Sequence, residues 1–345
     1  MVGVLVVTEP GAIRRVLVVR LSAIGDIVLT TPVLSELHRA LPDARIDYCT
    51  KAPFAPLVAS NPAVSSVVTP ESLTPGASYE LVVDLQNNRR SRALVRKLRV
   101  GKVTRYHKRN WKKLFLVQFK INVSDGYQSV VERYGEALDG LAVLAPKVTA
   151  PCSLYPSPED RAFAADVLGA DGPVLAVCFG ANHFTKRYPL ERFARIIEIV
   201  TSETPARVLL LGGKEDEPEA KKLIAMLPDT VRSRVLSLAG KASLMQSAAL
   251  LSRVDAVLTN DTGLMHIASA FGKKLFVIFG SSVKEFGFMP WGTEYELFET
   301  PGLSCRPCSH IGRSKCPKRH FRCMMEIAPE PIAARIVETL NKNSA

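Results

Sequence analysis

The chain alternates short, continuously apolar runs with amphipathic stretches, and it does so twice. A run that is apolar at every position, rather than at every second one, is typical of a parallel strand buried on both faces. Such strands need helical crossovers, so the repeated alternation predicts an α/β chain with two doubly wound, Rossmann-like halves. The expected strands cover residues 15–20, 45–49, 64–68, 79–85, 174–179, 207–211, 235–238, 256–258 and 275–279.

The length of 345 residues fits two domains of this kind. Pro156 and Pro158 precede a helical pattern and indicate an interdomain linker. Amphipathic helices are expected at residues 27–40, 54–60, 90–98, 129–144, 190–201, 218–226, 243–251 and 331–340. The predicted domains are residues 1–160, residues 161–328 with a cysteine-rich segment at 303–325, and a terminal helix at 329–345.

Residues 257–272 combine the end of a strand, a polar turn and a short helix closed by a glycine. Asn260 and Asp261 are of types that cap helices. The free amides of Thr262 and Gly263 would then point out of the sheet edge, and such a helix start binds phosphate groups. Gly263 has no Cβ, so a ligand could approach the backbone closely. An ordinary capped helix is the alternative.

Asp26 follows the first expected strand and a small-residue turn that contains Ser22 and Gly25, and it opens a helix. This order places a carboxylate at the carboxyl edge of the first sheet, where a ligand cleft is expected. The start of a helix stabilises an anion, so Asp26 could accept a proton there. A plain acid in a first helical turn is the alternative.

Lys186 lies in the loop after the first strand of the second half and could reach a phosphate held near Gly263. Glu215 follows the next strand and could accept a hydrogen bond from a ribose hydroxyl. His266 would lie close to the same helix start. The alternatives are a solvated lysine, a surface acid and a packing histidine.

Positive charge is concentrated in two stretches of a chain whose formal net charge is +12. Residues 85–124 contain 13 Lys or Arg and no acid, and residues 306–322 are also basic and free of acids. Such clusters favour an anionic partner: nucleic acid, phospholipid headgroups or a phosphorylated acceptor. A solvated basic surface is the alternative.

Four of the seven cysteines are crowded between positions 305 and 323. Cys305 and Cys308 have the spacing of a zinc-binding pair, whereas Cys316 and Cys323 are further apart than a second pair would be. A structural zinc site and free or redox-sensitive thiols both remain open.

Several classes are disfavoured because their signatures are missing. The sequence has no Gly-x-x-x-x-Gly-Lys loop, no Gly-x-Gly-x-x-Gly and no Asp-x-Asp metal-binding pair, which argues against P-loop enzymes and dehydrogenases. No apolar run is long enough to span a bilayer, and no signal peptide is recognisable. We expect a cytoplasmic protein.

Residues 15–26 and 259–268, taken in this order, resemble glycosyltransferase family 9, the ADP-heptose:lipopolysaccharide heptosyltransferases. Residues 186–189 (Lys-Arg-Tyr-Pro) add to the resemblance, which covers most of the chain. The cysteine segment is similar to the heptosyltransferase II branch.

The resemblance implies a GT-B fold, whose N-terminal half binds the acceptor and whose C-terminal half binds the nucleotide sugar. It also implies that the last helix packs back on the N-terminal half. Transfer would invert the anomeric centre without a catalytic metal or other cofactor. Asp26 corresponds to the general base and Lys186 to a group that holds the ADP diphosphate.

The implied partners are an ADP-sugar donor and a phosphorylated, carboxylated glycolipid acceptor on the inner membrane face. A peripheral enzyme at that anionic surface is therefore expected, with no nucleic acid. The nucleotide-sugar residues would be Thr185, Lys186, Glu215, Asp261, Thr262, Gly263 and His266. The acceptor residues would be Ser22, Gly25, Arg89, Arg90 and Arg92.

Three alternatives remain at this point. The first is a GT-B transferase that uses another nucleotide sugar. The second is a nucleic-acid-binding or anionic-lipid-binding protein with a zinc module, although that class would leave Asp26 and Gly263 unexplained. The third is a catalytically idle relative that only binds glycolipid.

Overall fold

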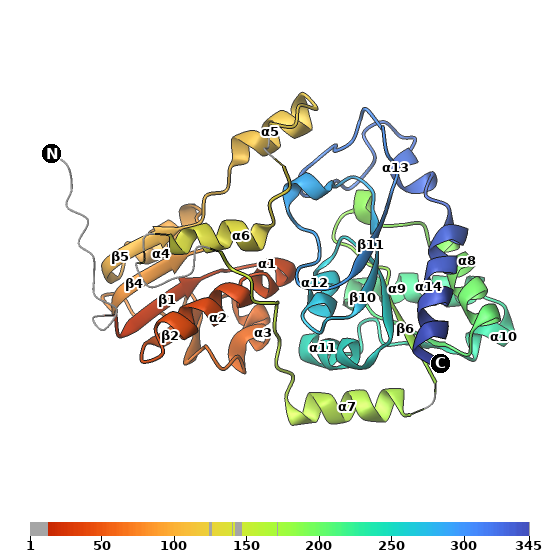
Figure 1. Cartoon of the computed structure of the whole chain (residues 1–345), viewed down its shortest axis with the longest axis horizontal. Coiled ribbons are helices and arrows are strands. Elements are labelled where there is room, and N and C mark those ends of the chain that lie inside the picture. The colour runs from red at the N-terminus through yellow and green to blue at the C-terminus, as the bar shows by residue number, and fades with distance from the viewer. Residues whose placement is uncertain (1–12, 124–125, 140, 142–146, 171, 345) are drawn as a thin grey trace. The chain divides into compact units, whose positions relative to one another are not determined.

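The structure is a computed structural model that describes residues 13–123, 126–139, 141, 147–170 and 172–344. The chain separates into two compact units (Figure 1). Unit 1 comprises residues 1–109 and 128–155, and unit 2 comprises residues 110–127 and 156–345. The sequence-based boundaries differ from this division mainly at residues 110–127, which were expected in the N-terminal domain.

Unit 1 is built on a five-stranded parallel sheet in the order β3-β2-β1-β4-β5. Its central strand β1 is buried from Val16 to Val19, as its continuous apolar run predicts. The apolar side chains of Leu17, Val82 and Val95 form part of the core beneath it. The strands are β1 (Arg15–Val19), β2 (Arg45–Cys49), β3 (Ser66–Val68), β4 (Ser78–Asp84) and β5 (Arg99–Arg105).

The connections of unit 1 are short helices and 3-10 turns. They are α1 (Ile24–Val28), α2 (Thr31–Ala40), η2 (Ala52–Phe54), α3 (Pro56–Ala59), α4 (Arg89–Val95), α6 (Val130–Gly135) and η3 (Glu136–Leu138). The helix expected at residues 129–144 begins with α6 and η3, and most of its remainder lies outside the described residues.

Unit 2 contains a six-stranded parallel sheet in the order β11-β10-β9-β6-β7-β8. The inner strands β6 and β9 are fully buried. The strands are β6 (Val174–Cys178), β7 (Arg207–Leu210), β8 (Val235–Ser237), β9 (Ala256–Asn260), β10 (Lys274–Phe279) and β11 (Tyr295–Glu299).

Helices cover this sheet, and Pro158 begins the first one after Tyr155, with Ser157 as its N-cap. The helices and turns are α5 (Asn110–Gln118), α7 (Pro158–Leu168), η4 (Phe184–Lys186), α8 (Leu190–Glu203), η5 (Lys214–Asp216), α9 (Glu217–Met226), α10 (Asp229–Arg232), α11 (Leu244–Arg253), α12 (Gly263–Ser269), η6 (Lys284–Phe286), α13 (Arg322–Met325) and α14 (Pro329–Ser344).

The terminal helix α14 packs against α8 within unit 2. Ile332, Ile336 and Leu340 form a stripe at helical spacing and are fully buried in the core of that unit. The apolar stripe of the terminal helix is therefore buried in unit 2, and the expected packing of residues 329–345 on the N-terminal half stays a prediction.

The sequence-based prediction missed the edge strands β5 and β11 and the helices α5, α10 and α13. In the described part of the chain, no helix combines the length and the apolar character that crossing a membrane requires.

Candidate functional site

Strand register brings polar loops together at one edge of each sheet. In unit 1, Val19 of β1 is level with Cys49 of β2 and Asp84 of β4. In unit 2, Cys178 of β6 is level with Thr259 of β9, and Asn260 is level with Ile278 of β10. The loops that follow these strands therefore start side by side, at the carboxyl edge where parallel α/β sheets bind ligands.

Asp26 lies in the first turn of α1, immediately after the carboxyl end of β1. Its Oδ1 accepts the Arg20 guanidinium at 2.6 Å and the Tyr134 hydroxyl at 3.0 Å. Its Oδ2 accepts the backbone N–H of Ala23 at 3.4 Å. The two shorter contacts are both to Oδ1, and the side chain is 22% exposed, so the carboxylate also reaches solvent.

Arg20 anchors this turn, and sequence reasoning missed it. Burial works to lower its pKa, but the charge of Asp26 and the neighbouring tyrosines raise it overall, so the cation is permanent. Its other nitrogens donate to the carbonyl oxygens of Ser22 and Leu85 at 2.9 and 2.8 Å. The sequence signal that could have identified Arg20 is its position, because it is a charged residue directly after the apolar run of β1.

Lys108 and Tyr134 are two further residues that the sequence did not indicate. The pKa of Lys108 is lowered by its half-burial and by Arg20, against the attraction of Asp26. Burial raises the pKa of Tyr134 well above its ordinary value, so its hydroxyl remains a donor to Asp26. Both residues are distant from Asp26 in sequence, and only the tertiary fold brings them together.

The three predicted acceptor arginines, Arg89, Arg90 and Arg92, are exposed at the start of α4. Asn88 caps this helix by accepting the N–H of Ser91 at 3.0 Å. Gln86 connects α4 to the Asp26 turn, because its Oε1 accepts the N–H of Leu21 at 2.9 Å. Cations at a helix N-terminus oppose the helix dipole, so they cost stability and create a positive potential.

Arg90 also lines an open pocket of about 940 Å³ at the carboxyl edge of the first sheet. Lys51 and Lys97 contribute two more cations, and the acid of Glu71 is present as well. The remaining walls are mainly apolar, including Leu21 from the turn after β1. The pocket therefore combines cations with apolar surface.

In unit 2, Lys186 and Asp261 form an ion pair at 2.7 Å between Nζ and Oδ2. Ser282 donates its hydroxyl to the same carboxylate oxygen at 2.6 Å. Burial works to raise the pKa of Asp261, but Lys186 and Ser282 hold it below its ordinary value. Three loops, after β6, β9 and β10, thus converge on one carboxylate whose side chain is only 10% exposed.

The helix start after β9 differs in detail from the prediction. The N-cap of α12 is Thr262, without a side-chain cap bond, and Gly263 is the first helical residue. Asn260 instead ends β9, where its amide group donates to the Phe179 carbonyl at 2.5 Å. Asp261 pairs with Lys186 rather than capping the helix. The predicted His266 is buried within α12.

Thr185 connects the Lys186 loop to the cysteine segment. Its buried hydroxyl accepts the N–H of Arg313 at 2.9 Å and the hydroxyl of Ser281 at 3.0 Å. Arg306 donates two bonds to the Ser282 carbonyl, at 3.2 and 2.7 Å. The cysteine segment therefore supports the backbone on which Lys186, Asp261 and Ser282 are placed.

Glu215 is exposed in η5, whereas the adjacent Asp216 is buried. Asp216 accepts the N–H of Gly213 at 2.9 Å and pairs with Arg187 at 3.6 Å. A Cβ at Gly180 would lie 2.2 Å from Asp216 Oδ2, so any side chain there would have to displace the Asp216 carboxylate. The structure makes Asp216 the organising acid of this loop, a role that the sequence did not reveal.

The four clustered cysteines are free thiols. Cys305, Cys308 and Cys316 are half-buried, and Cys323 is buried. Burial raises the pKa of Cys308, and it raises that of Cys323 to about 11, with smaller contributions from the neighbouring thiols. Within the described ranges, no three His, Cys, Asp or Glu side chains form a group arranged to hold a metal ion. Structural zinc stays a prediction.

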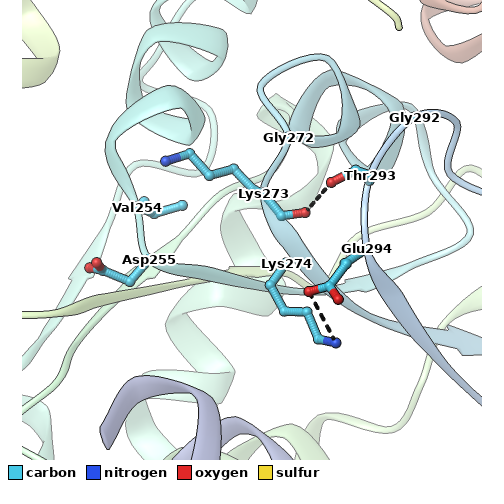
Figure 2. A pocket seen from close by; sticks show the side chains of 8 residues that line it. All are labelled: Val254, Asp255, Gly272, Lys273, Lys274, Gly292, Thr293 and Glu294. Carbon is cyan, nitrogen blue, oxygen red and sulfur yellow. Dashed lines mark hydrogen bonds and ion pairs between the residues drawn. The ribbon is translucent and has the colours of Figure 1, made fainter. Parts of the chain in front are cut away.

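A polar pocket of about 460 Å³ lies at the opposite edge of the second sheet (Figure 2). Asp255, Lys273 and Glu294 line it, and all three lie at or just before the amino ends of β9, β10 and β11. Thr293 donates its hydroxyl to the Lys273 carbonyl at 2.7 Å. Its location at the amino edge separates it from the Lys186–Asp261 site.

Solved structures share this architecture. A family 9 glycosyl transferase from Veillonella parvula matches with a TM-score of 0.77 at 19% identity, covering 95% of this chain and 98% of that one. The Escherichia coli ADP-heptose lps heptosyltransferase II matches with a TM-score of 0.72 at 20% identity, covering 96% and 100%. The fold class is therefore that of the GT-B glycosyltransferases, as predicted.

The family follows from sequence comparison. The model of glycosyltransferase family 9 (heptosyltransferase) matches residues 74–318, and the chain belongs to this family. Lipooligosaccharide heptosyltransferase 2 of Haemophilus influenzae is 25% identical over 359 residues, covering 95% of this chain and 100% of the relative. Lipopolysaccharide heptosyltransferase 2 of Escherichia coli K12 is 25% identical, covering 79% and 84%. The predicted enzyme class, a glycosyltransferase, is confirmed.

Proposed function

We propose that this enzyme transfers a heptosyl residue from ADP-heptose to the inner core of a lipopolysaccharide, at the cytoplasmic face of the inner membrane. The names of the relatives supply the sugar and the acceptor class. The observation that carries the chemistry is the Asp26 carboxylate, held by Arg20 and Tyr134 at the carboxyl edge of the first sheet.

Asp26 is the proposed general base. Because Arg20 and Tyr134 both bind Oδ1, the oxygen best placed to accept a proton is Oδ2. The acceptor hydroxyl gives its proton to Oδ2 while its oxygen forms a bond to the anomeric carbon. The bond from that carbon to the diphosphate oxygen breaks, and its electron pair leaves with ADP, inverting the centre.

Lys186 is proposed to stabilise the departing diphosphate. Its ammonium group is already held in place by Asp261, so little reorganisation is needed when negative charge develops. The amides of Thr262 and Gly263 begin α12 immediately after Asp261 and would donate to the phosphates. Thr185, Glu215 and His266 remain proposed donor-site residues.

Metal independence is part of the proposal, with Lys186 supplying positive charge at the diphosphate. Transfer should continue in excess EDTA. A strict requirement for Mg²⁺ or Mn²⁺ would contradict this assignment.

The acceptor site is proposed in unit 1. Arg89, Arg90 and Arg92 would bind its phosphate and carboxylate groups, and Ser22 and Gly25 would flank the reacting hydroxyl. The pocket shared by Arg90, Lys51 and Lys97 supports this assignment, because its cations and apolar walls fit an anionic amphiphile.

The test compares the wild type with Asp26→Asn and Lys186→Ala. We expect Asp26→Asn to reduce turnover with ADP-heptose by about 10²–10⁴-fold. ADP affinity in that variant should be unchanged, because in the proposed mechanism the carboxylate contacts the acceptor hydroxyl and not the nucleotide. Lys186→Ala should weaken ADP binding. Lys222→Ala, an exposed lysine on α9, is the matched control and should alter neither.

Two outcomes would contradict the proposal. Transfer that persists in Asp26→Asn would remove the general base. Selective binding of UDP or GDP over ADP would keep the glycosyltransferase and discard ADP-heptose as the donor.

A further inference from the structure

Exposed apolar side chains are concentrated on and around α5. Of the thirteen large apolar side chains that are exposed among the described residues, six lie between positions 111 and 127. Trp111, Leu114, Phe115 and Phe119 are 55%, 58%, 39% and 59% exposed. Their spacing of three and four residues places them on one face of the helix.

This apolar face, formed by Trp111, Leu114, Phe115 and Phe119, is ordered rather than loose. The rings of Trp111 and Phe115 lie 6.2 Å apart edge to face, and those of Phe115 and Phe119 lie 5.5 Å apart. Just beyond the helix, Lys120 donates to the Pro307 carbonyl at 2.6 Å. Lys113 lies 5.8 Å over the Phe288 ring. The helix is thus fastened to unit 2 with its aromatic face outward.

The charge around the face is positive. Lys112, Lys113 and Lys120 belong to a stretch, residues 85–124, without a single acid. The hydrogen bond from Lys120 to the Pro307 carbonyl places the end of this stretch beside the second acid-free stretch, residues 306–322. That stretch exposes Lys315 and Lys318, and its Ile311 side chain is 56% exposed.

Apolar rings surrounded by cations match one partner chemistry, the surface of an anionic phospholipid bilayer. Aromatic side chains are favoured at the boundary between headgroups and acyl chains, and nearby lysines are attracted to anionic lipid. The Lys112 ammonium lies 5.6 Å over the Trp111 ring, so the residue already pairs an apolar body with a cationic tip. A protein partner of acidic character would not need four exposed apolar side chains in one row.

We infer that α5 is an interfacial anchor, which lays its apolar face into an anionic bilayer while the flanking lysines contact lipid phosphates. Its nine residues extend only about 14 Å, so the helix would lie along the surface. This inference deepens the proposed function, because a glycolipid acceptor is itself held in a bilayer.

The test uses the full chain and vesicles of phosphatidylcholine with or without one quarter phosphatidylglycerol. Trp111 and Trp291 are the two tryptophans, so Trp291→Phe leaves Trp111 as the reporter. We expect its emission to shift to the blue with anionic vesicles, and brominated acyl chains to quench it. Inorganic phosphate alone should produce neither change.

Vesicle co-sedimentation of variants in the wild-type background separates the two contributions. Leu114→Gln with Phe119→Gln should weaken partitioning about tenfold or more by removing apolar contact. Lys315→Gln with Lys318→Gln should weaken partitioning about 30-fold by removing two cations. The control Lys222→Ala with Met226→Gln, which changes one exposed cation and one exposed apolar residue on α9, should leave it unchanged.

Unchanged partitioning in the Leu114/Phe119 variant would overturn the inference. A wild-type dimer that forms without vesicles and is lost in this variant would also overturn it, because the apolar face would then bind a second copy of the chain. Sugar transfer to a deacylated, soluble acceptor is measured separately, because this reaction tests the proposed function without requiring a membrane. The Leu114/Phe119 variant should retain that activity. Wild-type protein that binds vesicles through α5 but transfers no sugar would leave the anchor standing and refute the proposed function alone.

Discussion

Replacing Lys186 by methionine should destabilise unit 2 even without any ligand. Nζ of Lys186 lies 2.7 Å from Oδ2 of Asp261, and the two side chains are only 17% and 10% exposed. Removing one partner of a buried pair leaves the other charge uncompensated, which typically costs 3–5 kcal/mol. Because Ser282 still donates to Asp261, we expect the lower end, about 3 kcal/mol at pH 7.

The effect should shrink at low pH. The pKa of Asp261 in the folded protein is held below the ordinary 3.8, although burial opposes this. A carboxyl of this kind adds stability above its unfolded pKa, and that stability is lost as the pH falls through the folded-state value. In Lys186→Met, the cation that lowers the pKa of Asp261 is gone, whereas the burial that raises this pKa remains. Acidification therefore protonates a carboxylate that destabilises the variant. The difference in unfolding free energy between the variant and the wild type then becomes smaller.

Trp111 and Trp291 both belong to unit 2, so urea unfolding followed by tryptophan emission reports on that unit. The cycle of Lys186→Met, Asp261→Asn and the double variant should give a coupling energy of about 2 kcal/mol. Two results would refute the ion pair. In the first, the losses of unfolding free energy in the two single variants add up to that of the double variant within about 0.5 kcal/mol. In the second, the loss in Lys186→Met is the same at pH 7 and pH 3.

Two further predictions concern packing and thiols. Gly180→Ala should lower the free energy of unfolding by about 2 kcal/mol, because the new methyl group would lie 2.2 Å from Asp216 Oδ2. Thermal denaturation measures this loss. Adding Asp216→Ser to Gly180→Ala should restore part of it, because the serine side chain is shorter. Burial raises the pKa of the Cys49 thiol to about 12. At pH 8, Cys49 should therefore react with Ellman's reagent only after unfolding. The half-buried Cys305, Cys308 and Cys316 should react first, and equal rates for all seven thiols would contradict the burial pattern.

The central strands were predictable because their continuous apolar runs allow few other structures. β1, expected at residues 15–20, spans Arg15–Val19, and β6, expected at 174–179, spans Val174–Cys178. The edge strand β5 was missed because Arg99, Lys102 and Arg105 interrupt its apolar positions. An edge strand tolerates such charges because one of its sides is open.

The partners within the site were less predictable than its positions. The turn that carries Asp26 is a local feature, and its place at the carboxyl edge follows from the order of strand and helix. Tyr134 reaches Asp26 across 108 residues, and Ser282 reaches Asp261 from another loop. Local periodicity carries no information on such contacts, which depend on the packing of α6 and on the register of β9 with β10.

Residues 110–127 join unit 2 from within the sequence of unit 1, so the polypeptide passes between the units three times. In genetic terms, no single breakpoint divides the coding sequence into two segments that each encode one whole unit. A chimera joined at residue 155 would pair α5 of one parent with the Phe288 and Pro307 of the other. Exchange of halves between relatives therefore has to carry α5 along as a third, separate piece.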